Sequence, residues 1–300
     1  MQTHQPITGL HVVGVRYRGS RPAQRDERSL DAYAAANVYQ TIQTPTTVVE
    51  PRFPESQRQP VEPDNLGIIG GAIADAVAEG VRSGKAILMS GGDCNHITGV
   101  FGGLQTVYGA DARIGLVWFD AHGDFNTPKT TISGMLGGMP VAVCAGLAYP
   151  NWRVGSRIAA PLPTERIVMV DVRNLDPLEE QLIRATDVVV AAPAVGFPGE
   201  PLAPAIEQLA ACCDLIYLHI DSDILDERYV PNHGTREPNG PDMAQVLAAV
   251  DTVMATGKVA AFAVVSVYGE GEGSAQSVAS GIELIRGGLQ TWQKYGMSKA

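Results

Sequence analysis

Residues 114–126 read Ile114-Gly115-Leu116-Val117-Trp118-Phe119-Asp120-Ala121-His122-Gly123-Asp124-Phe125-Asn126. The first six residues are an apolar run, which predicts a buried β-strand. Asp120, His122 and Asp124 follow at alternating positions. Because side chains at alternating positions of an extended chain point to one side, these three groups are expected to converge just beyond the strand.

The same pattern, an apolar run that ends in polar residues, recurs along the chain. Leu215–Ile220 leads into Asp221 and Asp223, and Ala86–Met89 leads into a segment that holds Cys94. The strands expected from such runs are 10–15, 86–89, 114–119, 167–172, 187–191, 215–220 and 259–267. The helices expected between them are 66–83, 95–108, 137–148, 177–185, 202–212, 241–256 and 275–294. This alternation predicts an α/β fold with a parallel sheet, whose chemistry lies beyond the carboxyl ends of the strands.

Four carboxylates are expected to meet in one crevice, those of Asp120, Asp124, Asp221 and Asp223. Like charges at such short range cost stability unless a cation neutralises them. Oxygen ligands with one imidazole suit a divalent ion such as Mn²⁺. Two ions that share bridging carboxylates would lie ~3.5–4 Å apart and activate a water. A single Asp at a strand end is more often a turn former or a cap, but five ligand-type residues at alternating positions favour a metal centre.

The composition excludes several classes of protein. Of the 300 residues, 45% are hydrophobic, which excludes intrinsic disorder. The net charge of −10 argues against a nucleic-acid partner. No apolar run reaches the roughly 20 residues of a membrane helix, and residues 1–6 do not resemble a signal peptide. The four cysteines, at 94, 144, 212 and 213, indicate a reducing, cytoplasmic setting.

One domain is expected over residues 1–300. Within it, residues 41–64 contain five prolines and few apolar runs, which predicts an exposed loop and not a linker between domains.

Three segments resemble the metal motifs of the arginase/agmatinase (ureohydrolase) family, in the same order and with matching spacing. They are Gly91-Gly92-Asp93-Cys94, residues 118–126 and His219-Ile220-Asp221-Ser222-Asp223. The resemblance covers roughly residues 60–295. It implies an arginase-like, three-layer α/β/α fold with a central, mainly parallel sheet. It also implies an amidinohydrolase that cleaves a linear C–N bond at a dinuclear Mn²⁺ centre.

The resemblance assigns a metal-ligand role to six residues. Asp120 and Asp221 would bridge both ions, and His122 and Asp223 would complete one of them. Asp124 would help to hold the other ion, together with Cys94, which stands where the family usually has His.

The resemblance also assigns four substrate contacts. Asn126 and Ser133 match residues that contact a substrate carboxylate, Asp176 matches the residue that meets an α-amino group, and Thr235 matches a pocket threonine. These contacts have simpler alternatives, because Asp176 precedes Pro177 and is a natural helix N-cap, and Asn126 and Ser133 are ordinary loop residues.

The first departure from the family pattern is Cys94. A soft thiolate shifts the preference at one ion towards Zn²⁺ or Fe²⁺. The alternative is a small buried residue with that ion weakened or lost. Some arginase-like enzymes that act on N-hydroxyarginine carry Cys at this place.

Two further departures concern the reacting end of the substrate. Gly137 stands where relatives have a proton-shuttling His, and His233 or His96 are candidates to replace it. Ser266 stands where relatives have a guanidinium-binding Glu. Glu270 or Glu272 would compensate if they reached the site, and otherwise belong to a solvated turn.

These features predict a hydrolase of an N-hydroxyarginine-like or other modified guanidino amino acid, acting by metal-bound hydroxide. Asp124 and His233 are the candidate catalytic residues, with Asp124 taking the proton of the water. One or two Mn²⁺ ions are the expected cofactor.

The main alternative is a non-catalytic metal-binding or regulatory homologue. A deacetylase-like amide hydrolase is the third possible function. The expected partner is a small-molecule substrate, with no nucleic acid and no membrane. The relatives imply a homo-oligomer, although the composition alone also fits a monomer.

Overall fold

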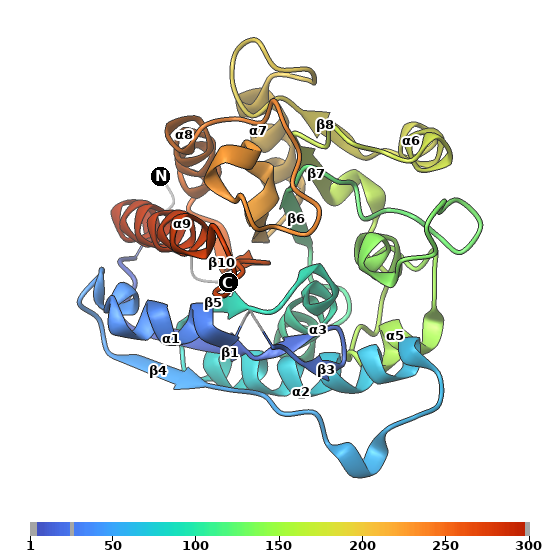
Figure 1. Ribbon diagram of the computed structural model, residues 1–300, viewed down its shortest axis with the longest axis horizontal. Helices are drawn as coiled ribbons and strands as arrows, with labels where there is room; N and C mark the ends of the chain where they lie inside the picture. The colour runs from blue at the N-terminus through green and yellow to red at the C-terminus, as the bar shows by residue number, and fades with distance from the viewer. Residues whose placement is uncertain (1–4, 25–26, 298–300) are drawn as a thin grey trace.

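The computed structural model describes residues 5–24 and 27–297. Its centre is a sheet of eight strands that all pair in parallel (Figure 1). Because both faces of such a sheet are covered, its strands read as continuous apolar runs. The strands are β1 (Leu10–Val15), β4 (Thr46–Val49), β5 (Ala86–Gly91), β6 (Ile114–Phe119), β7 (Ile167–Val170), β8 (Val189–Ala191), β9 (Leu215–Asp221) and β10 (Val259–Val265). A short antiparallel pair, β2 (Tyr17–Arg18) and β3 (Arg21–Pro22), lies outside this sheet.

Helices cover both faces of the sheet, which gives the predicted three-layer α/β/α arrangement. One face packs against α1 (Glu27–Ala35), α7 (Leu202–Cys212), α8 (Met243–Met254) and α9 (Ser274–Tyr295). The other packs against α2 (Glu62–Arg82), α3 (Ile97–Tyr108), α4 (Pro140–Cys144), α5 (Pro150–Gly155) and α6 (Pro177–Arg184). None of the helices in the described ranges is long and apolar enough to cross a membrane.

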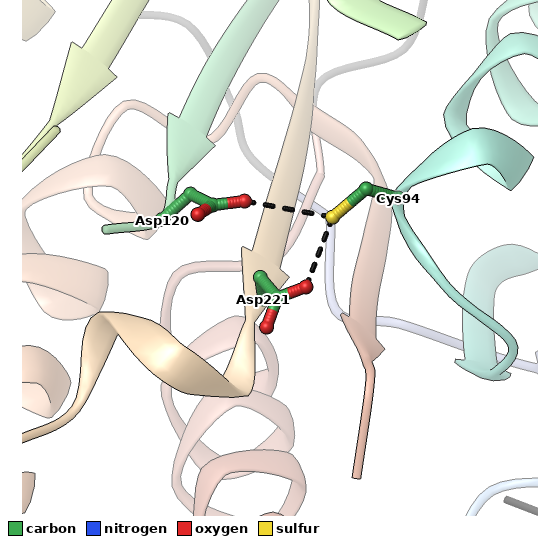
Figure 2. A group of neighbouring side chains, drawn as sticks. All are labelled: Cys94, Asp120 and Asp221. Atoms are coloured by element: carbon green, nitrogen blue, oxygen red, sulfur yellow. Dashed lines mark hydrogen bonds between the residues drawn. The ribbon is translucent and has the colours of Figure 1, made fainter. Parts of the chain in front are cut away.

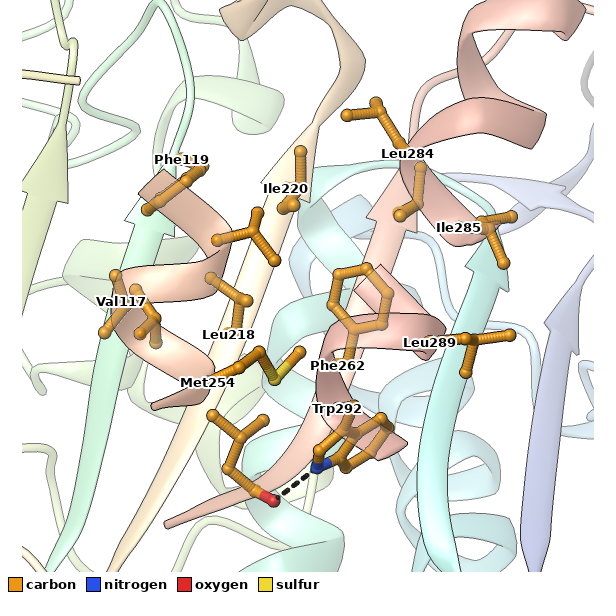
Figure 3. Packing of buried hydrophobic residues seen from close by; sticks show 14 of the residues in the cluster. Val117, Phe119, Leu218, Ile220, Met254, Phe262, Leu284, Ile285, Leu289 and Trp292 are labelled. Carbon is orange, nitrogen blue, oxygen red and sulfur yellow. Dashed lines mark hydrogen bonds between the residues drawn. The ribbon is translucent and has the colours of Figure 1, made fainter. Parts of the chain in front are cut away.

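The α9 side of the core shows how the layers are held together (Figure 3). Phe262 of β10 meets the ring of Trp292 edge to face, with centroids 6.2 Å apart, and both side chains are fully buried. The indole N–H of Trp292 donates to the backbone oxygen of Val259 at 3.0 Å, so its one polar atom is satisfied. Burial of one such side chain contributes about 1.5–3 kcal/mol.

The strand order places the carboxyl ends of distant segments together. The order is β4-β1-β5-β10-β9-β6-β7-β8. β5 and β6 follow each other in the chain, yet β10 and β9 lie between them in the sheet. Such a reversal opens a crevice at the carboxyl edge of a parallel sheet. The segments that follow β5, β6, β9 and β10 all meet there.

Backbone geometry ends two of these strands earlier than the sequence predicts. β7 ends at Val170 and not at residue 172, because Asp171 adopts a φ of 64°. β10 ends at Val265 and not at residue 267, because Ser266 adopts a φ of 59°. Residues with positive φ cannot continue an extended strand.

Other sequence-based boundaries also need correction. The segment 41–64 is not simply an exposed loop, because Thr46–Val49 forms the edge strand β4 beside β1, and α2 already begins at Glu62. The predicted helix 137–148 is confined to Pro140–Cys144, after a 3-10 turn that contains Gly137 and Gly138. Glycine is a poor helix former, so the helix begins only at the proline. The helices α1 and α5 were not predicted.

Candidate metal centre

A cavity of about 410 Å³ opens at the carboxyl edge of the sheet. Its lining includes all eleven residues predicted as ligands, catalytic groups or substrate contacts: Cys94, Asp120, His122, Asp124, Asn126, Ser133, Asp176, Asp221, Asp223, His233 and Thr235. The structure therefore brings together residues from four strand ends and from the loops between them.

The turn after β5 delivers Cys94 to the cavity. Gly91 and Gly92 have φ values of 75° and 73°, which favour glycine. The Sγ atom of Cys94 lies 2.9 Å from Oδ2 of Asp221 and 3.5 Å from Oδ2 of Asp120 (Figure 2). These three buried side chains form the first of three groups that could each hold an ion.

His122 forms the second group, with Asp120 and Asp223. Its Nδ1 lies 3.3 Å from Oδ1 of Asp120 and 3.2 Å from Oδ2 of Asp223. Its Nε2 lies 3.4 Å from Oε1 of Glu237, which also accepts the side-chain N–H of Asn174 at 2.6 Å. A carboxylate on the far nitrogen fixes the imidazole so that Nδ1 faces the other ligands.

His233 forms the third group, with Asp221 and Asp223. Its Nε2 lies 3.3 Å from Oδ1 of Asp221, and its Nδ1 lies 3.6 Å from Oδ2 of Asp223. The ring is buried, and Nε2 lacks a well-aligned hydrogen bond. Thr235 supports this group, because its hydroxyl donates to Oδ2 of Asp223 at 3.1 Å.

The three groups overlap, because each of the carboxylates Asp120, Asp221 and Asp223 belongs to two of them. Burial, and then the neighbouring carboxylates, raise the pKa of Asp120 well above its usual value. Burial opposes the charge of His122, but its hydrogen bonds with Asp120 and Asp223 outweigh burial and raise its pKa to about 12. For Asp221, burial is outweighed by the hydrogen bond and charge of His233, which lower the pKa. The site thus needs positive charge, and the imidazoles supply part of it.

Asp124 lines the same cavity but belongs to none of the three groups. Its φ of 46° lies in the left-handed region. Burial is the main cause that raises its pKa well above the usual value. The loop that carries it is held by the buried Glu179, whose Oε1 accepts the backbone N–H of Phe125 at 2.8 Å. A protonated or cation-paired carboxyl is favoured at this place.

The predicted substrate contacts lie along another wall of the cavity. Nδ2 of Asn126 donates to Oδ2 of Asp176 at 3.2 Å, and the same oxygen accepts the backbone N–H of Ile132 at 2.9 Å. Asp176 is also the N-cap of α6, in a capping box with Glu179, so both interpretations of this residue are compatible. Ser133 is exposed at the mouth, where its hydroxyl accepts the N–H of Met135.

The two departures from the family pattern at the reacting end, Gly137 and Ser266, both line the cavity. Gly137 lines the cavity, and a Cβ there would meet nothing closer than Sδ of Met135 at 3.6 Å. Ser266 is buried and its hydroxyl is hydrogen-bonded to Asp221. The candidate replacements His96, Glu270 and Glu272 do not line the cavity, which favours the structural alternative for each of them.

Their contacts explain why. His96 contacts the backbone of Asp93 and of Gly19, as part of a capping box. Glu270 forms an ion pair with Arg28 at 3.3 Å.

The sequence did not single out several residues that shape the site. Arg18 lies with its guanidinium carbon 4.3 Å from the ring centroid of Tyr268, and both residues line the cavity. His219 lies directly behind Cys94, with Nε2 3.7 Å from Sγ. Burial lowers the pKa of His219 to about 3. Strand alternation could have indicated His219, since it stands two positions before Asp221 and so shares its side of the sheet.

The donor set fits a divalent cation. Buried carboxylates that raise one another's pKa, beside imidazoles held by further hydrogen bonds, are the environment that a bound ion stabilises. Oxygen and imidazole donors suit Mn²⁺, and the sulfur of Cys94 adds a soft donor on one side only.

Known proteins resemble this chain in sequence. The model of the Arginase family matches residues 21–287. The arginase of Bacillus caldovelox is 31% identical over 167 residues, which are 54% of this chain and 54% of that protein. The N(omega)-hydroxy-L-arginine amidinohydrolase of Streptomyces lavendulae is 30% identical over 216 residues, which are 71% of this chain and 73% of that protein. The aligned stretch thus spans only about half the length of the first of these relatives.

The fold is also similar to solved structures. The crystal structure of arginase from Bacillus subtilis subsp. subtilis str. 168 superimposes with a TM-score of 0.79 at 23% sequence identity, covering 94% of this chain and 98% of that one. This likeness supports the α/β/α fold.

Proposed function

The chain belongs to the arginase family, and we propose on that basis that it is a metal-dependent amidinohydrolase of a modified guanidino amino acid, such as an N-hydroxyarginine-like compound. The observation that carries the proposal is the overlap of three metal-ligating groups, through shared carboxylates, in one cavity. Similarity to the Streptomyces lavendulae protein supports the choice of substrate class.

We assign the metal ligands to Cys94, Asp120, His122, Asp124, Asp221 and Asp223. One or two ions, Mn²⁺ with Zn²⁺ or Fe²⁺ possible on the sulfur side, would supply a Lewis acid and a water of lowered pKa. The contact between Oε1 of Glu237 and Nε2 of His122 keeps Nδ1 of the imidazole turned towards the carboxylates.

Asp124 and His233 are the groups that we assign to proton transfer. Asp124 lines the cavity beside the ligand groups, so its cation-paired carboxylate would take the proton of the attacking water. As the C–N bond breaks, the leaving nitrogen needs a proton. Burial lowers the pKa of His233, but the charges of Asp223 and Asp221 outweigh burial and raise it, which favours the imidazolium as the donor.

The amino-acid end of the substrate would lie against Asp176, Asn126 and Ser133. The carboxylate of Asp176 suits an α-ammonium group, and the amide of Asn126 with the hydroxyl of Ser133 suits a carboxylate. Thr235 would act mainly through Asp223, to which it donates.

The reacting end favours a group less basic than plain guanidinium. Ser266 offers no charge there, and its hydroxyl is already engaged with Asp221. The guanidinium of Arg18 lies on Tyr268 in the same cavity. A neutral hydroxyl is a poor partner for a full guanidinium charge, whereas a weakly basic N-hydroxyguanidine or amidine has less need of a carboxylate partner.

A second candidate is a metal-binding homologue without turnover, which Gly137 and Ser266 favour. The test incubates the Mn²⁺-loaded protein with arginine, N-hydroxyarginine, guanidino acids and amidino acids, and detects products by mass spectrometry. We expect a urea-type product from a modified guanidine, at a rate well above that of Asp120→Asn. Full metal content with no product from any compound would favour the second candidate.

We also propose that residues 1–300 form one domain and that it assembles as a homo-oligomer in the cytoplasm, as the family resemblance and the cysteine content lead us to expect. Light scattering coupled to gel filtration measures the assembly, and a mass of one chain would contradict it.

A further inference from the structure

His219 lies in β9 immediately behind the sulfur of Cys94. Its side chain is fully buried, and its Nε2 is 3.7 Å from Sγ. The two residues are 125 positions apart and meet only because β9 and the end of β5 are close in the sheet. The same sulfur also contacts the carboxylates of Asp221 and Asp120. The imidazole is therefore a third polar neighbour of this sulfur, beside the two carboxylates.

The hydrogen bond at the other ring nitrogen decides where the imidazole carries its proton. The hydroxyl of Tyr217 lies 2.8 Å from Nδ1 of His219. Within the described residues, the buried phenol has its hydrogen bond with this nitrogen, so the O–H donates and Nδ1 accepts. An imidazole that accepts at Nδ1 carries its hydrogen on Nε2. The Nε2–H therefore points at the sulfur.

Aromatic packing holds the imidazole in this orientation. The ring stacks on Trp118, with centroids 4.3 Å apart and planes within 9°. Trp118 is itself fixed, because its indole N–H donates to the backbone oxygen of His122 at 3.1 Å. Tyr217 meets the other edge of the ring at 87°. The N–H is thus preorganised towards Cys94 before any ion binds.

We propose that His219 is a positioning residue that holds the Cys94 sulfur as a thiolate ligand through an N–H···S hydrogen bond. The inference rests on the proposed metal centre and concerns the sulfur ligand of that centre. When an ion binds, the S–H bond breaks, a metal–sulfur bond forms, and the proton leaves to solvent. The N–H of His219 then supports the negative sulfur, as outer hydrogen bonds support other metal ligands.

A purely structural role is the competing explanation. In that case the imidazole fills space beside Trp118 and satisfies Tyr217, and the sulfur is only its neighbour. The two explanations differ in whether the effect of changing His219 depends on the sulfur at position 94.

The test uses Co²⁺ as the probe, because a thiolate bound to Co²⁺ gives a ligand-to-metal charge-transfer band. We expect the wild-type protein to show the band and Cys94→Ser to lose it. His219→Phe keeps an aromatic ring on Trp118 but removes the N–H. It should weaken Co²⁺ binding on the sulfur side by ~10–100-fold. In the Cys94→Ser background, His219→Phe should have no further effect.

Two more variants keep the test decisive if His219→Phe folds poorly. His219→Gln retains an N–H donor and should restore most of the band. Tyr217→Phe removes the hydroxyl that keeps the imidazole hydrogen on Nε2. It should therefore weaken the band while leaving the fold intact. Equal losses of affinity from His219→Phe in both backgrounds would overturn the inference, as would Co²⁺ binding without a band. Failure of the wild type to bind Co²⁺ at all would overturn the metal centre itself, which is a separate and recognisable result.

Discussion

Nε2 of His233 lies 3.3 Å from Oδ1 of Asp221, at the carboxylate that is shared by two of the three ligand groups. The imidazole is therefore in reach of both the ligands and a substrate in the cavity.

The first prediction concerns this imidazole. His233→Asn should lower kcat by ~10²–10⁴-fold, because the leaving nitrogen loses its proton donor. Metal content should stay near that of the wild type. Steady-state kinetics with metal analysis of the same samples measures both, and added imidazole should restore part of the rate. Unchanged kcat in His233→Asn would remove His233 from the mechanism.

The second prediction concerns the shared carboxylate. Asp221→Ala should abolish turnover and release metal while the chain stays folded, because Asp221 belongs to two ligand groups. Exposed Asp75, which lies outside the cavity, supplies the matched control Asp75→Ala. Substantial turnover of Asp221→Ala at full metal content would contradict the bridging role.

The third prediction concerns Gly137. Gly137→His should raise kcat, because the open space beside this residue accepts a side chain and the new imidazole would face the cavity. The control is Gly137→Ala, which adds a Cβ without a proton donor. If both variants have wild-type rates, proton transfer at this wall does not limit the reaction.

The fourth prediction concerns stability and pH. The folded-state pKa of His122 is raised to about 12, so the stability from its ion pairs is complete below pH ~6.5 and is lost as pH rises. The raised pKa values of Asp120 and Asp124 act in the same direction, because ionising them in the fold is unfavourable. The lowered pKa of Asp221 affects stability only in strong acid, where the stability contributed by its ionised carboxylate is lost.

The metal-free protein should therefore melt at lower temperature as pH rises from about 6 to about 9. Metal binding at a hundredfold excess over Kd adds about 2.7 kcal/mol to the free energy of unfolding. The rise in Tm on metal addition should become larger as pH rises, because the metal neutralises carboxylates whose ionisation destabilises the metal-free fold. Scanning fluorimetry with and without chelator measures the margin, and Asp120→Asn should erase it. A margin that shrinks with rising pH would disprove the assignment.

The fifth prediction concerns Cys94. Cys94→His should raise Mn²⁺ affinity on that side, because imidazole suits this ion better than a thiolate does. Cys94→Ser should lose that ion, since a neutral hydroxyl is a poor replacement. Metal stoichiometry at fixed free Mn²⁺ distinguishes the three proteins. Identical stoichiometry and affinity in all of them would mean that Cys94 only packs.

The sequence was sufficient for most of the sheet. The ranges of β1 and β6 agree at both ends with the apolar runs, because strands buried on both faces must be apolar throughout. The edge strand β4 escaped prediction, because Pro45 and Pro51 flank it and only one side of an edge strand needs a partner.

The candidate site likewise contains residues whose grouping the sequence predicts and residues whose position it does not predict. Alternation along one strand end is enough to pair Asp120 with His122, and along another to pair Asp221 with Asp223. The approach of His219 to Cys94 could not, because it depends on which strands are neighbours. The positions of Glu237 and Arg18 depend on loops, which carry no periodic signal. That residues 1–300 form one domain stays a prediction.

The positive φ values at Asp124, Asp171 and Ser266 have a consequence for anyone who evolves this protein in the laboratory. Each such residue costs about 1–3 kcal/mol, and glycine would relieve that cost. Asp124 and Ser266 line the cavity, so relief there removes a carboxylate or a hydroxyl from the site. A library screened for heat resistance alone should therefore enrich substitutions at these positions that erase the chemistry, and a screen for catalysis must run beside it.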